Sequence, residues 1–115
     1  MAITEPYTLN AVTVGTTELS IVSGTTTLQN VASAAVYQLW LDAGNMLKGD
    51  EFRVRLYEKV LAGSTKKVSS QWSLMGLQAE LLITPTFMKM HGWDMTIQKI
   101  AGTDRAFTAS IRKAG

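Results

Sequence analysis

The segment Trp93–Arg112 constrains the fold most, because apolar and polar residues alternate along it on both sides of one turn. Strict two-residue alternation is typical of half-buried β-strands. The sequence therefore predicts an antiparallel hairpin whose turn is Ala101–Asp104. Its buried face takes alternate residues from the two strands, namely Trp93, Met95, Ile97, Phe107, Ala109 and Ile111.

Alternation also predicts shorter strands upstream of this segment. The clearest are Val36–Asp42 and Glu51–Val60, the second with Phe52, Val54 and Leu56 facing inward. Further strands are expected near residues 16–22, 25–31, 66–74 and 87–90, with a loop over 43–50, a hairpin connection over 61–65 and a short helix as an alternative within 75–83.

Short strands at intervals of roughly 8–12 residues, without a long amphipathic helix, are typical of a sandwich or barrel. We therefore expect an all-β protein, an antiparallel β-sandwich or small barrel that is jelly-roll-like or Ig-like. A chain of 115 residues has the size of one domain. Residues 1–12 contain a proline and little alternation, so they are expected to form an extended N-terminal arm, and residues 13–115 a single sandwich domain.

The composition is that of a folded and weakly charged protein. Hydrophobic residues make up 46% and charged residues 17%, which excludes wholesale disorder. The net charge of +2 is thinly spread, so a nucleic-acid partner, which usually requires a basic stripe, is not expected. The chain has no cysteine, which removes disulfides, thiol nucleophiles and thiolate metal sites.

Neither a signal peptide nor a membrane span is expected. The first residues lack a basic stretch followed by an apolar run. The uncharged interval Leu19–Leu41 is long enough to span a bilayer, but Ser, Thr, Asn and Gln residues interrupt it throughout. We therefore expect a soluble protein without a membrane partner.

No residue pattern in the chain is typical of an active site. His91 is the only histidine, and with Asp94 it would form either an acid–base pair or part of a metal site. A zinc site needs three or four ligands, so we favour a structural turn around His91. Asp42, Asp50 and Glu51 flank a glycine-containing loop without the rhythm of a calcium-binding loop. Nucleophile-elbow and phosphate-binding motifs are also missing, so we expect no enzyme activity, cofactor, metal or small-molecule substrate.

The three tryptophans divide between predicted core and predicted surface. Trp72 and Trp93 fall on faces that are expected to be buried. Trp40 lies opposite the core face of its strand, where it forms a subunit interface, a second core layer or a ligand platform. The next strand has three outward side chains, Arg53, Arg55 and Tyr57. They are equally compatible with a subunit interface and with a solvated polar face.

Two pairs of stretches carry a family resemblance: Val36–Asp42 with Gly49–Lys59, and His91–Arg105 with Ser110–Arg112. Together they resemble small β-rich virion accessory proteins of tailed bacteriophages, over most of residues 15–113. The resemblance implies a capsid decoration (cement) protein that is made in the host cytoplasm. It further implies a homotrimer bound to the major capsid protein on the outer surface of the virion. These motifs are strand and turn patterns and assign no activity.

Two alternatives to a decoration protein stay open. One is a host-surface or carbohydrate-binding module of a head or tail fibre, and the other is a tail or connector subunit. The residues expected to form contacts with a partner are Ile3, Pro6, Tyr7, Leu9, Trp40, Arg53, Arg55 and Tyr57.

Overall fold

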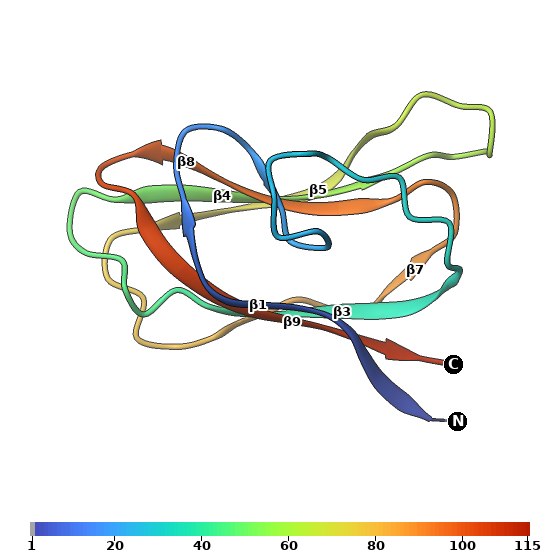
Figure 1. The fold of residues 1–115 in the computed structure, drawn as a ribbon, viewed down its shortest axis with the longest axis horizontal. Coiled ribbons are helices and arrows are strands. Elements are labelled where there is room, and N and C mark those ends of the chain that lie inside the picture. Colours follow the sequence, from blue (N-terminus) through green and yellow to red (C-terminus); the bar gives the residue numbers. More distant parts are fainter. Residues whose placement is uncertain (1) are drawn as a thin grey trace.

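The computed structural model describes residues 2–115, which contain nine strands and no helix, and so no helix that could cross a membrane. Two antiparallel sheets pack face to face (Figure 1), which confirms the predicted all-β sandwich. The strands are β1 (Ile3–Val14), β2 (Leu19–Ser20), β3 (Ala35–Asp42), β4 (Glu51–Glu58), β5 (Lys67–Met75), β6 (Leu82–Ile83), β7 (Phe87–Lys89), β8 (Asp94–Ala101) and β9 (Arg105–Ala114).

The strands pair in the order of a jelly roll. Sheet A has the order β1-β9-β3-β6, with β7 also paired to β3, and sheet B has the order β2-β8-β4-β5. When β6 and β7 are counted as one interrupted strand, the eight strands pair first with last, second with seventh, third with sixth and fourth with fifth. Successive pairs alternate between the sheets, as in a double-sheet jelly roll.

Strands β8 and β9 do not form the hairpin that the sequence predicts for Trp93–Arg112. β8 pairs with β2 and β4 while β9 pairs with β1 and β3, so the two strands lie in different sheets. The side chains predicted to be buried are nevertheless buried, because both strands point them into the space between the sheets. Phe107 of β9 meets Phe52 of β4 edge-on there, with ring centroids 4.7 Å apart. Alternation indicates a buried face, but it does not identify the neighbouring strand.

The core between the sheets is built around Trp93, which is fully buried. The rings of Tyr37 and Tyr7 pack against it, with centroids 4.5 Å and 5.9 Å away. Its indole Nε1 donates a hydrogen bond to the Ser33 carbonyl oxygen at 3.0 Å, so the polar edge of the buried ring has a partner. The predicted inward faces of β3 and β4 are confirmed by the burial of Tyr37, Leu39, Leu41, Phe52, Val54 and Leu56.

The extended N-terminal arm predicted for residues 1–12 is not confirmed, because Ile3–Val14 is an edge strand of sheet A. β1 pairs antiparallel with β9, although register shifts interrupt the pairing around Pro6 and around Ala11, whose φ is 52°. Bulges of this kind break the two-residue period, which explains why the segment shows little alternation. Met1 lies outside the described residues.

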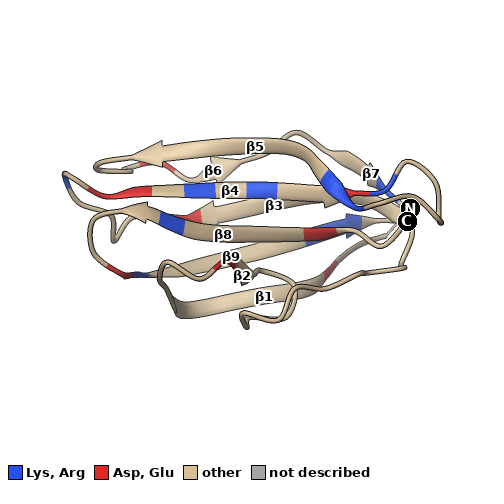
Figure 2. Cartoon of the chain, turned by 90° about the horizontal axis from the view of Figure 1, so that it is seen from above, with Lys and Arg blue, Asp and Glu red and all other residues tan. Residues whose placement is uncertain are grey.

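Several other predicted boundaries also shift. The strand expected near residues 16–22 contracts to Leu19–Ser20, and residues 25–31 form only isolated bridges. The β4–β5 hairpin is confirmed, with residues 59–66 as its connection. The short helix considered within 75–83 is replaced by β6. The two chain ends lie side by side (Figures 1 and 2), and Gly115 N donates to the Ala2 carbonyl oxygen at 3.3 Å.

Candidate interaction surface

His91 and Asp94 take separate structural roles in the fold. Asp94 is fully buried, and its carboxylate accepts hydrogen bonds from Ser20 Oγ and Gln29 N, both at 2.8 Å. Burial raises the pKa of the Asp94 carboxyl, while these hydrogen bonds oppose that shift. The main-chain N–H of His91 donates to Glu58 Oε1 at 3.0 Å. Asp94 therefore fastens the loop between β2 and β3 to β8.

Asp50 is also a structural carboxylate. It is 4% exposed and accepts hydrogen bonds from Arg105 Nε at 2.7 Å, Leu47 N at 2.9 Å and Thr103 N at 3.0 Å. The bond from Arg105 is the main cause that lowers the pKa of Asp50 to about 2. Within residues 2–115, no three His, Asp or Glu side chains gather as a metal site would require.

The outer face of sheet B carries a polar network centred on Glu18. Tyr57 donates its hydroxyl hydrogen to Glu18 Oε2 at 2.7 Å, and Thr96 Oγ1 donates to the same oxygen. Arg55 Nη1 lies 3.6 Å from Glu18 and donates to Gln98 Oε1 at 2.7 Å. Burial, together with the Glu18 carboxylate, raises the pKa of Tyr57 to about 12. These side chains satisfy one another, which favours the solvated polar face over the interface for this sheet.

The outer face of sheet A carries a row of apolar side chains that crosses four strands. Ile3 of β1 pairs with Ala114 of β9, Ala114 with Val36 of β3, and Val36 with Met88 of β7. Residues directly opposite each other on neighbouring strands point to the same side of a sheet. The exposed fractions of Ile3 (77%) and Met88 (87%) show that this side faces solvent. A solvated sheet face is normally polar, so a continuous exposed apolar row indicates a binding surface.

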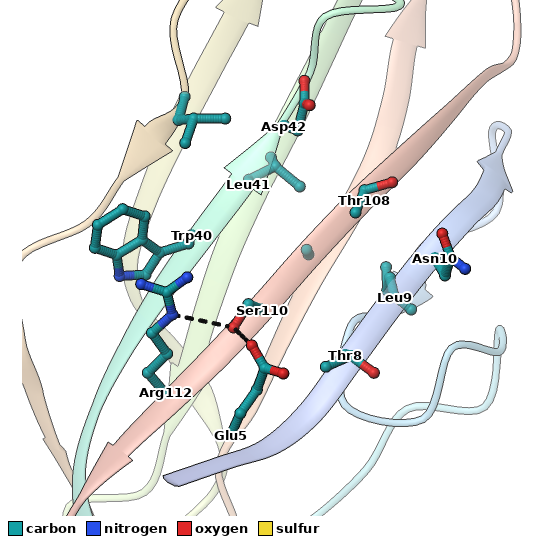
Figure 3. A pocket seen from close by; sticks show the side chains of 12 residues that line it. Glu5, Thr8, Leu9, Asn10, Trp40, Leu41, Asp42, Thr108, Ser110 and Arg112 are labelled. Atoms are coloured by element: carbon teal, nitrogen blue, oxygen red, sulfur yellow. Dashed lines mark hydrogen bonds between the residues drawn. The ribbon is translucent and has the colours of Figure 1, made fainter. Parts of the chain in front are cut away.

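Trp40 and Arg112 lie next to each other on the same face (Figure 3), and they line one hollow together with Ile3, Val36 and Ala114 of the apolar row. The guanidinium carbon of Arg112 lies 4.0 Å from the centroid of the Trp40 ring, in cation–π contact. Trp40 Nε1 donates to Gln38 Oε1 at 3.0 Å, and Arg112 Nε donates to Ser110 Oγ at 3.3 Å. The Ser110 hydroxyl in turn donates to Glu5 of β1. Trp40 is thus half-buried on the solvent side of sheet A and does not form a second core layer.

Two open hollows flank the Trp40–Arg112 pair. One of about 300 Å³ lies over β1, β9 and β3, where the small side chains of Thr108 and Ser110 leave room (Figure 3). The other, of about 240 Å³, extends toward the apolar row. The polar groups around the first hollow include Glu5, Thr8, Asn10 and Asp42.

The eight predicted contact residues do not form one surface. Ile3 and Trp40 lie on the outer face of sheet A, and Pro6 is exposed on β1. Leu9 is 3% exposed, so its side chain belongs to the core, whereas Tyr7 is only partly buried, with its ring packed against Trp93. The opposite outer face, that of sheet B, holds Arg53, Arg55 and Tyr57.

The sequence does not single out several members of the sheet A face, namely Met88, Ile83, Arg112 and Ala114. Their side chains reach Val36 and Trp40 only through strand pairing, as Val36 lies opposite Met88 and Trp40 opposite Ile83. The sequence does show that β3 has apolar residues on its second face. This pattern indicates a surface on β3, but it does not identify the residues of neighbouring strands that complete the surface.

The fold and the surface define a jelly-roll β-sandwich with one polar outer face and one partly apolar outer face. Lys and Arg residues are interspersed with Asp and Glu along the strands (Figure 2). No known protein family, curated protein or solved structure matches this chain.

Proposed function

We propose that this chain is a non-enzymatic structural protein of a tailed-bacteriophage virion. In this role it is a capsid decoration protein that sits on the outer capsid surface and stabilises contacts between capsomers of the major capsid protein. The observation that carries the proposal is the apolar row on the outer face of sheet A, defined by Ile3, Ala114, Val36 and Met88. The resemblance in β3, β4 and the β8–β9 segment supports the virion context.

The jelly-roll fold is compatible with this role but does not assign it. Double-sheet jelly rolls occur in viral capsid domains, in lectins and in cupins, so the function must come from the surface. Met, Trp and Arg are enriched at the centres of protein interfaces, and sheet A presents Met88, Trp40 and Arg112 together. Burial of apolar surface contributes roughly 25 cal/mol per Å². A capsid repeats each weak contact over many copies, so a modest apolar face is sufficient.

A carbohydrate-binding role is the second candidate, and the hollow beside Trp40 favours it. Glu5, Asn10 and Asp42 supply hydrogen-bonding groups around this hollow of about 300 Å³. Sugar binding of this kind normally uses an open aromatic face. Here the Arg112 guanidinium already covers one face of the Trp40 ring, which favours adhesion over stacking.

The proposal is tested with virions of the phage that encodes this chain, prepared without the protein. The purified protein should bind these particles and raise the temperature at which they release DNA. Met88→Glu should abolish both effects, because it places a charge in the apolar row. Leu47→Glu is the matched control, since Leu47 is also exposed (49%) but lies in the loop between β3 and β4. Equal binding by the two variants, or particles whose heat stability does not change, would reject the decoration role.

The same material separates the alternatives. A carbohydrate-binding module would bind a glycan on an array, and the Asp42→Ala variant would no longer bind it. The protein would then have no effect on the heat stability of the particles. A tail or connector subunit would appear by electron microscopy as a ring at the tail rather than over the head.

A further inference from the structure

Three of the four edges of the sandwich are protected against pairing with another strand. β1 carries Pro6 and two register shifts, and both proline and bulges block edge pairing. β2 has only two residues. The opposite edge of sheet A consists of β6 and β7, two short strands that are separated by Pro85.

The remaining edge, that of β5, is long and open. β5 spans nine residues, Lys67–Met75, without proline or glycine, and its main chain pairs with β4 alone among the strands. Its one register shift leaves Ser69 without a residue opposite it on β4, whereas the pairing of Ser70–Met75 is regular. Alternate residues of such an edge point both N–H and C=O away from the sheet. Only the Gln78 side-chain amide, 3.0 Å from the Met75 carbonyl oxygen, caps this edge within residues 2–115.

The regular part of this edge is also uncharged. Ser70–Met75 contains no Lys, Arg, Asp or Glu, so a second strand of the same sequence would not repel it. Lys67, the charged residue of β5, lies at its first end, away from the middle of the strand.

We propose that β5 pairs antiparallel with β5 of a second copy of this chain, to form a two-fold dimer with a continuous eight-stranded sheet. The antiparallel direction brings the first end of one strand beside the last end of the other. With Gln71 at the two-fold axis, Gln71 lies opposite Gln71 of the other copy, Ser70 opposite Trp72, and Lys67 opposite Met75. No two like charges face each other in this register, so a copy of the same chain satisfies the open main chain without charge repulsion. This inference does not depend on the proposed function, and it gives a dimer where the resemblance implies a trimer.

The mass of the protein in solution provides the first test. Analytical ultracentrifugation over a concentration series should show a species of twice the 12.5 kDa chain mass. Gln71→Lys should weaken dimerisation about tenfold or more, because it places like charges close to the two-fold axis. Asn10→Lys is the matched control, since Asn10 is also exposed but lies on the protected edge strand β1. Both variants are first shown to melt at the wild-type temperature, so that a change in mass reports pairing.

Mixing and hydrogen exchange provide the second test. Gln71→Glu alone should also weaken the dimer, and mixing it with Gln71→Lys should restore a dimer of the two variants. In the wild-type dimer, alternate amides of Ser70–Met75 should exchange more slowly than in the Gln71→Lys monomer. A wild-type monomer at all concentrations, a trimer, or a dimer that Asn10→Lys weakens and Gln71→Lys does not, would overturn the inference.

Discussion

Arg105 Nε lies 2.7 Å from Asp50 Oδ2, and this ion pair joins the residue before β4 to the first residue of β9. The other carboxylate oxygen of Asp50 accepts a hydrogen bond from Thr103 N at 3.0 Å. One side chain thus holds sheet B against the turn through which the chain crosses to sheet A.

Asp50→Asn should destabilise the protein at neutral pH and remove part of its acid sensitivity. The folded protein lowers the pKa of Asp50 from 3.8 to about 2, so the unfolded chain binds this proton more readily. The resulting stability is fully present above about pH 4 and is lost as the pH falls toward about 2. Urea unfolding at a series of pH values should therefore show a flatter profile for Asp50→Asn over that window. Parallel profiles of variant and wild type would contradict this role of Asp50.

Gly102→Ala should destabilise the same turn by about 2–4 kcal/mol, through backbone strain and steric overlap. Gly102 has a φ of +91°, and an added Cβ would lie 2.7 Å from Asp50 Cα and 2.9 Å from the Gly49 carbonyl oxygen. Gly63→Ala is the control, because nothing lies within 4 Å of a Cβ there. Urea denaturation of both variants measures the difference, and an equal effect would exclude the predicted overlap.

Trp93→Ala and Trp40→Ala should differ strongly, although both remove an indole. Trp93 is fully buried against Tyr37, so its truncation should cost about 3–5 kcal/mol of unfolding free energy. Trp40 is half-buried on the outer face of sheet A, and its truncation should cost less than half as much while weakening any binding at that face. Thermal unfolding compares the two, and similar losses would mean that Trp40 belongs to the core.

Lys89→Met should raise the melting temperature. Lys89 is 3% exposed, and among residues 2–115 its ammonium contacts Ser69 Oγ at 3.4 Å and the Phe87 ring at 5.5 Å, both long distances. Burial lowers the pKa of Lys89, against an opposing effect of Glu58. The unfolded chain therefore binds this proton more tightly than the folded protein, and wild-type stability should rise with pH toward 10.5. Lys89→Met should lack that rise in calorimetry, and a lower melting temperature would show that the ammonium is well satisfied.

Side-chain direction could be predicted from the sequence, whereas strand pairing could not. Phe52, Val54 and Leu56 alternate without interruption, and all three are buried as expected. Alternation in β8 and β9 likewise indicates their buried faces. The two-residue period is the same whether the next strand is a hairpin partner or lies in the other sheet, so alternation does not identify the partner. β1 went unrecognised because its bulges at Pro6 and Ala11 shift the period twice.

The candidate surface was predicted only in part, for the same reason. Trp40 was placed correctly on the second face of its strand. Ile3, Ala114, Val36 and Met88 are far apart in the chain and become neighbours through three separate strand pairings. An exposed methionine or isoleucine viewed alone carries no such information.

The position of β9 between β1 and β3 has a consequence for biosynthesis. β1 is translated long before β9, its partner strand in sheet A, so the main chain of β1 has no strand to pair with until β9 has been made. The middle of sheet A therefore forms last, and a premature stop before Arg105 would remove that middle rather than trim an edge.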